Sequence, residues 1–277
     1  STVVLKADGT VEVVGLSSTS VAESIPAGSE AVFNSGTAYS NSVAFVPDNA
    51  NTFVVTYRDG DSASYGTAIV GTVSGTTITF GTAVVYNSSA TINNAMSFDP
   101  NNAGTFVVTY KDDGNSNYGT SIVGTVSGTS LSFGSEVTFN VGVTGESAVA
   151  FDPNTANKFV VAYADEGNAD YVMAIVGTVS GTSISYGSEY VLSTGHPVNL
   201  ALSFDPNTAG KFVVVSRDFD LASYGVAIIG TVSGTAITFG SEVVFNSGVV
   251  TANAVSFDPN NANKFVVVYQ DSSNSGY

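Results

Sequence analysis

The chain has no cysteine, no tryptophan, a single histidine and only seven basic residues among 277. Without cysteine it can form no disulfide, no thiolate zinc site and no cysteine nucleophile. So few lysines and arginines cannot form a cluster that neutralises phosphates, which argues against nucleic acid and anionic membrane surfaces as partners. The lone His196 has no repeated counterpart, so no histidine-based catalytic triad can be built with any specificity.

Long hydrophobic runs are also missing. Apolar runs such as 265–269 are far too short to span a bilayer, so we expect no membrane insertion. Residues 1–9 do not have the basic start and apolar stretch of an intact signal peptide. The chain does have 43% hydrophobic residues, 29 glycines and a net charge of -16, which is the composition of an acidic protein with a real core.

An internal repeat of 53 residues organises most of the chain. Two motifs recur in this step: Phe-x-Pro at Phe45, Phe98, Phe151, Phe204 and Phe257, and Gly-Thr-Val-Ser-Gly-Thr at Gly71, Gly124, Gly177 and Gly230. A fixed period of this length is typical of solenoids and propellers, in which each repeat is one supersecondary unit.

Each unit is predicted to hold four strands. In the unit 94–146 they are 94–98, 106–110, 118–126 and a strand from 129 to about 140, and no helical periodicity is present. The second strand, Phe-Val-Val-Thr-Tyr, lacks alternation, which indicates burial on both faces. Asparagine alternates with glycine at one turn position, which predicts a positive φ there. That position is occupied by Asn51, Gly104, Asn157, Gly210 and Asn263.

The sequence therefore predicts an all-β protein, a β-propeller of four-stranded antiparallel blades, with an open β-solenoid as the competing fold. Residues 28–277 would form the repeat propeller. Residues 1–27 would form an N-terminal hairpin and an insertion, and the hairpin would complete the last blade. The prediction is five blades closed by the N- and C-terminal strands. The rivals are a fragment of a longer repeat protein and a hairpin that completes the next molecule in a head-to-tail polymer.

An aspartate recurs in the loop after each second strand, and other acids follow it. Candidate calcium ligands in these loops are Asp59, Asp61, Asp112, Asp113, Asp165, Asp218 and Asp220. The loops lack the full ligand spacing and the terminal bidentate glutamate of a calcium loop. The alternative is that each aspartate caps its own turn. No other cofactor is expected.

A tyrosine follows each of these loops and begins the third strand. These candidate ligand contacts are Tyr65, Tyr118, Tyr171, Tyr224 and Tyr277. A repeated tyrosine beside polar groups can stack on a sugar ring, and several weak sites would strengthen one another. Packing between blades is the alternative role.

An enzyme is not expected from the sequence. Five-bladed propeller glycosidases are similar to this architecture, and they place acids on the inner strands that face the central channel. The inner strands here hold no acid; they are 41–45, 94–98, 147–151, 200–204 and 253–257. Near-identical repeats are also a poor way to build the asymmetric pair of carboxylates that glycoside hydrolysis needs.

The repeat also contains distinctive sequence motifs, among them Ser-Phe-Asp-Pro, Lys-Phe-Val-Val-Val-Tyr and Ile-Thr-Phe-Gly-Ser-Glu-Val-Val-Phe-Asn. Over residues 28–277 it resembles repeats in virion structural proteins of marine tailed phages, cyanophages among them. The resemblance implies a non-enzymatic tail, fibre or capsid-surface component that serves as scaffold and host-contact module. Its partners would be other virion proteins or a host surface glycan, and it could form oligomers. It would be located in the virion or in the extracellular space. The alternative is a secreted, lectin-like propeller that binds glycans at several sites.

Overall fold

The computed structural model describes residues 2–5, 11–14 and 28–274. This part of the chain is all-β and antiparallel, with two short 3₁₀ turns at Asp113–Asn115 and Ser272–Asn274. None of its helices is long and apolar enough to cross a membrane. The all-β prediction is confirmed.

The strands follow the predicted units. In the second unit, β8 (Thr105–Asp112) pairs with β9 (Tyr118–Ser127), and β9 pairs with the short β10 (Ser130–Phe133). Two long strands, β7 (Val84–Phe98) and β11 (Val137–Phe151), each form the outer strand of one unit and then the first strand of the next. Neighbouring units are therefore joined by continuous backbone.

The other units repeat this arrangement. The first contains β3 (Ala38–Phe45), β4 (Thr52–Asp59), β5 (Tyr65–Ser74) and β6 (Thr77–Phe80), and the third contains β12 (Lys158–Asp165), β13 (Tyr171–Ser180) and β14 (Ser183–Ser193). The fourth contains β15 (Pro197–Phe204), β16 (Lys211–Asp218), β17 (Tyr224–Ser233), β18 (Ala236–Phe239) and β19 (Val243–Asn246). The fifth contains β20 (Val250–Phe257) and β21 (Phe265–Asp271), beside β1 (Thr2–Leu5) and β2 (Val11–Val14).

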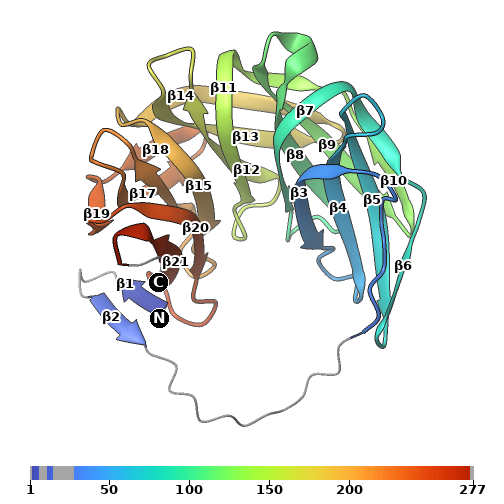
Figure 1. The fold of residues 1–277 in the computed structure, drawn as a ribbon, viewed down its shortest axis with the longest axis horizontal. Coiled ribbons are helices and arrows are strands. Elements are labelled where there is room, and N and C mark those ends of the chain that lie inside the picture. The colour runs from blue at the N-terminus through green and yellow to red at the C-terminus, as the bar shows by residue number, and fades with distance from the viewer. Residues whose placement is uncertain (1, 6–10, 15–27, 275–277) are drawn as a thin grey trace.

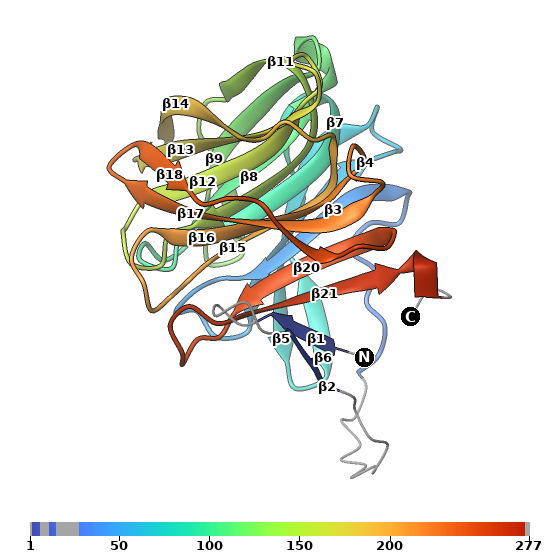
Figure 2. The ribbon, with the colours of Figure 1, turned by 90° about the vertical axis from the view of Figure 1, so that its left-hand side faces the viewer.

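The units follow one another around a common centre (Figure 1), and their sheets stack face against face (Figure 2). The first three units form one 12-stranded sheet because β7 and β11 pair on both sides, and the fourth forms a five-stranded sheet. The fifth unit forms a four-stranded sheet in the order β2-β1-β21-β20, and Val3 of β1 pairs with Val267 of β21. No sheet of the described residues closes on itself, so a closed propeller ring is not shown.

The core lies between neighbouring units. Phe106, Val107 and Val108 of β8 are fully buried, which confirms that the second strand packs on both faces. One face of that strand contacts the preceding unit and the other contacts the next, where Val107 packs with Val149 and Phe151. Burial of this kind supplies most of the stabilising free energy, at about 25 cal/mol per Å² of apolar surface.

Two glycine-rich features have direct structural causes. The turn position shared by asparagine and glycine has the predicted positive φ, for example 79° at Gly104 and 63° at Asn157. Gly124 pairs across strands with Phe106, and the Phe106 ring lies where a Cβ on Gly124 would sit. The repeated glycine of the Gly-Thr-Val-Ser-Gly-Thr motif is thus required by the aromatic side chain on the neighbouring strand.

Candidate functional site

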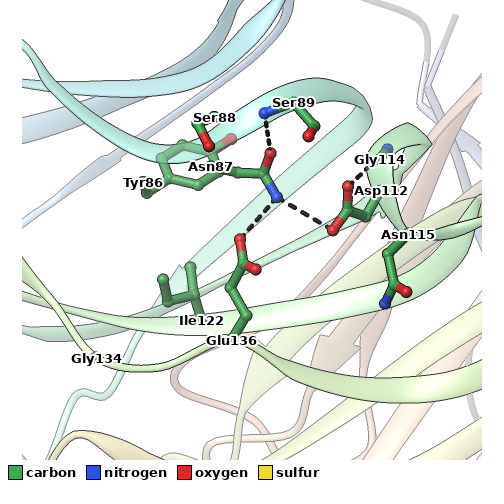
Figure 3. A pocket seen from close by; sticks show the side chains of 10 residues that line it. All are labelled: Tyr86, Asn87, Ser88, Ser89, Asp112, Gly114, Asn115, Ile122, Gly134 and Glu136. Atoms are coloured by element: carbon green, nitrogen blue, oxygen red, sulfur yellow. Dashed lines mark hydrogen bonds between the residues drawn. The ribbon is translucent and has the colours of Figure 1, made fainter.

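A polar pocket of about 480 Å³ opens between the first and second units (Figure 3). Its side chains come from neighbouring strands and from a break between two strands. Asn87 lies in the outer part of β7, Asp112 ends β8, and Glu136 lies in the break between β10 and β11. Ser88 and Ser89 add hydroxyl groups beside Asn87. The site is therefore assembled from the outer strand of one unit and the loops of the next.

The Asn87 amide connects two carboxylates. Its Nδ2 donates to Glu136 Oε1 at 2.7 Å and to Asp112 Oδ2 at 3.2 Å, as Figure 3 shows. Its Oδ1 accepts from the backbone N–H of Ser89 at 2.6 Å, which fixes the orientation of the amide. Because one nitrogen bonds both carboxylates, Asp112 and Glu136 are close neighbours in the pocket.

Both acids have a second hydrogen bond that holds them in place. The buried Tyr110 donates its hydroxyl to Glu136 Oε1 at 2.7 Å, and Asp112 Oδ1 accepts from the backbone N–H of Gly114 at 3.0 Å. Burial raises the pKa of Asp112, and the negative charge of Glu136 raises it further. Burial and the same glutamate also raise the pKa of Tyr110, so that it remains a hydrogen-bond donor. The pocket therefore holds two neighbouring carboxylates, and the side chains of Asn87 and Tyr110 and the backbone N–H of Gly114 donate hydrogen bonds to them.

The neighbouring interface has the same residue types in a different arrangement. Tyr163 donates to Glu189 at 2.6 Å, and Asn140 donates to Asp165 at 3.1 Å. The second bond of the Asn140 amide goes to Thr144 at 3.0 Å instead of to Glu189. Among the described residues, an amide that bridges two carboxylates occurs only between the first and second units.

The first aspartate of each loop, which in four loops is a candidate calcium ligand, caps its own turn. Each accepts a hydrogen bond from the backbone N–H two residues later. These bonds join Asp59 to Asp61, Asp112 to Gly114, Asp165 to Gly167, Asp218 to Asp220 and Asp271 to Ser273, at 2.8 to 3.2 Å. Asp113 lies exposed in the 3₁₀ turn that follows Asp112. Within residues 2–5, 11–14 and 28–274, no three His, Cys, Asp or Glu side chains gather as a metal ion would need.

The predicted tyrosine contacts lie outside the pocket. Four of them are half-buried and begin third strands: Tyr65, Tyr118, Tyr171 and Tyr224. Each pairs across strands with the aspartate of its own loop. Tyr171 packs against the core between the second and third units. Tyr277 lies outside the described residues.

The sequence analysis included Asp112 and missed its two partners. Asn87 and Glu136 do carry a signal, because each recurs in the repeat register. The recurring positions are Asn34, Asn87, Asn140 and Asn246, and Glu30, Glu136, Glu189 and Glu242. The expectation of no carboxylate pair was based on the inner strands, which hold no acid, whereas the pocket acids lie at the outer part of the interface between two units.

Comparison with known proteins finds likeness only at the level of structure. No protein-family model matches the sequence, and no curated protein matches it. An exo-β-1,3-galactanase from Phanerochaete chrysosporium, solved with β-1,3-galactotriose, is similar with a TM-score of 0.51 and 9% identity, over 91% of this chain and 64% of that one. AofleA from Arthrobotrys oligospora is similar with a TM-score of 0.53 and 10% identity, over 84% of this chain and 66% of that one.

These structures correct the functional expectation. At such low identity the likeness shows the fold alone, and the chain spans less than two thirds of the galactanase. The expectation of a phage virion structural protein without enzymatic activity is nevertheless wrong on this comparison, because a similar structure is that of a carbohydrate-active enzyme, an exo-β-1,3-galactanase. The physical reason lies in the pocket: neighbouring carboxylates are present, and divergence among the repeats makes their arrangement asymmetric. The phage resemblance and the location stay predictions that nothing here tests.

Proposed function

We propose that this chain is a carbohydrate-active protein that binds a neutral glycan in the pocket between its first and second units. The observation that carries the proposal is the Asn87 amide bonded to both Asp112 and Glu136 in an open, polar pocket. Neighbouring sugar hydroxyls donate well to carboxylates and accept well from amides. A few converging polar groups of this kind fix the orientation of a ligand.

Charge selects the class of glycan. Two carboxylates face the pocket, and the chain as a whole carries a net charge of -16. A uronic acid or a sulfated sugar would place its negative charge beside Asp112, whose pKa Glu136 already raises. Like charges this close repel each other, so an anionic sugar is disfavoured in the pocket. A neutral sugar that donates hydrogen bonds relieves the repulsion instead.

The fold supports the same proposal, since the similar galactanase structure contains a bound oligosaccharide. We further propose that the five units are propeller-type blades and that the hairpin of β1 and β2 completes the fifth blade, while the outer faces of the first and fifth units stay open within one chain. The pairing of β1 with β21 supports this assignment. In a propeller, all the loops that follow second strands lie on one face, so Asp112 would belong to the ligand-binding face.

A second candidate function is hydrolysis of the bound glycan. The observation that favours it is the pair of adjacent carboxylates, one of which has a raised pKa. Glycoside hydrolases use one protonated and one ionised carboxyl group. In this candidate reaction Asp112 would be the general acid, and Glu136, held in place by Tyr110, would be the second carboxyl group.

The binding proposal is tested by titrating the protein with neutral β-1,3-galacto-oligosaccharides and with uronate oligomers, followed by calorimetry. We expect a neutral ligand to bind, and Asn87→Ala to weaken binding about tenfold or more, because it removes two charge-assisted hydrogen bonds from the pocket. The matched control is Asn140→Ala, which alters the equivalent amide of the next interface. Binding that is unaffected by Asn87→Ala, or a preference for uronates, would refute the proposed site.

Hydrolysis is tested separately by measuring reducing ends released from the same oligosaccharides. Glu136→Gln should abolish any turnover, whereas Glu189→Gln should leave it unchanged. Binding without turnover would reject hydrolysis and retain the binding function. Turnover that survives Glu136→Gln would place the reaction elsewhere.

A further inference from the structure

The first unit exposes two large apolar side chains whose counterparts are covered in the later units. Val43 is 64% exposed and Phe45 is 61% exposed. At the Phe45 position, the four later units have phenylalanines that are only 4 to 7% exposed, namely Phe98, Phe151, Phe204 and Phe257. Each of these is covered by the unit that precedes it. The face of the first unit that carries Val43 and Phe45, called here the leading face, therefore has the composition of an interface.

The fifth unit exposes the opposite half of the same interface. Val268 of β21 is 51% exposed. Its counterparts in the four earlier units are fully buried: Thr56, Thr109, Ala162 and Val215. Each of these faces the unit that follows it, as Val215 does in packing with Phe257. The face of the fifth unit that carries Val268, called here the trailing face, therefore lacks the neighbour that every other unit has.

The internal interfaces show how the two faces fit. Between the fourth and fifth units, buried Val215 contacts the cluster of Phe257 and Val255, which are the counterparts of Phe45 and Val43. Polar contacts follow the same register, since Asp205 Oδ2 accepts from the backbone N–H of Asn263 at 2.8 Å. At the open faces this bond would join Asp258 to Asn51, whose φ of 70° matches that of the other turns.

We propose that the leading face of one chain binds the trailing face of a second copy of this chain, in a head-to-tail contact. The contact would continue the interface that the chain already forms between its own units. A second copy is the fitting occupant because Phe45 and Val268 remain exposed and so do not cover each other within one chain. In Figure 1, β3 and β21 lie at the two ends of the series of units. Such a heterologous contact builds rings or filaments.

The first test is the mass of the intact chain by light scattering and sedimentation over a range of concentrations. We expect species larger than the 28.2 kDa monomer, with a fraction that grows with concentration. Val43→Asp and Val268→Asp should each return the chain to a monomer, because each buries a charge in the contact. The control is Val141→Asp, which changes an equally exposed valine away from both faces and should not alter the mass.

The second test is disulfide cross-linking between introduced cysteines, which have no native cysteine to compete with them. At an internal interface, Thr109 Oγ1 lies 3.1 Å from Ser147 Oγ, so cysteines at these two positions would be close enough to bridge. The counterparts at the open faces are Val268 and Asn41. A mixture of Asn41→Cys and Val268→Cys chains should form a disulfide-linked dimer on mild oxidation, and a chain with Thr109→Cys and Ser147→Cys should form an internal bridge as the reference.

Two outcomes would overturn the proposal. One is a monomer at all concentrations with no mixed disulfide. The other is a bridge that forms only within a chain carrying both Asn41→Cys and Val268→Cys, which would mean that the two faces close a ring inside one molecule. Neither outcome affects the glycan pocket, which lies between the first and second units.

Discussion

Replacing Asp99 by alanine should destabilise the protein far more than replacing Asp258, although the two residues occupy the same place in the repeat. Both belong to a Phe-Asp-Pro turn, and both accept a local bond from the backbone N–H two residues later, at 2.9 and 2.8 Å. Only Asp99 has a unit after its own in the described chain. Its Oδ2 accepts from the backbone N–H of Asn157 at 2.7 Å, which connects the second and third units.

The expected magnitude follows from the burial of Asp99, whose side chain is fully shielded from solvent. Removing the carboxylate takes away two charge-assisted bonds and leaves the Asn157 N–H without its partner in the interface. Bonds to charged groups contribute about 1.5 to 3 kcal/mol each, so we expect a loss of about 3 to 6 kcal/mol for Asp99→Ala. Asp258 is only half-buried, so water replaces the lost bonds there, and the change should be much smaller.

The assay is urea denaturation followed by circular dichroism, with both substitutions made in the Val43→Asp background so that association does not contribute. Repeat proteins can unfold in parts, so hydrogen exchange at the Asn157 amide provides a second, local measure. That amide should lose protection in Asp99→Ala. Equal losses of stability in the two variants, or unchanged protection of Asn157, would refute the idea that the aspartate couples neighbouring units.

Two further predictions concern the pocket and the repeated glycines. The raised pKa of Asp112 means that the folded protein holds this proton more tightly than the unfolded chain does, so the site is most stable below the unfolded value of about 3.9 and loses stability as the pH rises through the folded pKa. Asp112→Asn should therefore stabilise the protein more at pH 7 than at pH 4 in urea titrations, and equal changes at both pH values would contradict this. Gly124→Ala should cost more stability than Gly128→Ala, because its Cβ would overlap the Phe106 ring, whereas a Cβ on Gly128 meets open space. At Gly128 only the positive φ of 61° opposes alanine, at about 1 kcal/mol, and equal melting temperatures would count against the explanation.

Much of the fold could be predicted from the sequence because the repeat shows which differences between copies are permitted. Asn157 and Gly104 occupy the same position in two copies of the repeat, which indicates a positive φ, and both residues have a positive φ. The lack of alternation between apolar and polar residues in β8 indicates burial on both faces, and that burial is observed. Such features are local, since each depends on a few neighbouring residues whose physical roles are known.

The pocket could not be predicted in the same way because its contacts cross from one unit to the next. Asn87 and Glu136 are 49 residues apart and belong to different units. Their distance depends on how two sheets stack and on the break in the outer strand that leaves Glu136 outside the ladder. Residue patterns within one strand contain no information about that stacking. The sequence therefore indicates Asp112 as a recurring loop residue, but not the Asn87 amide that joins it to Glu136.

A duplicated scaffold can still build one specific site, because the residues that complete it vary independently among the units. Four positions define the pocket: an asparagine from one unit, and a tyrosine, an aspartate and a glutamate from the next. The successive interfaces read Asn34, Tyr57, Asp59 and Ala83; Asn87, Tyr110, Asp112 and Glu136; Asn140, Tyr163, Asp165 and Glu189; and Ser193, Ser216, Asp218 and Glu242. Only the second and third sets are complete.

Where serine replaces the tyrosine, Glu242 has a buried oxygen without a hydrogen-bond partner among the described residues, so the tyrosine is what holds this glutamate in place. Of the two complete sets, the third directs its amide to Thr144, which leaves the second as the one interface whose amide joins both carboxylates.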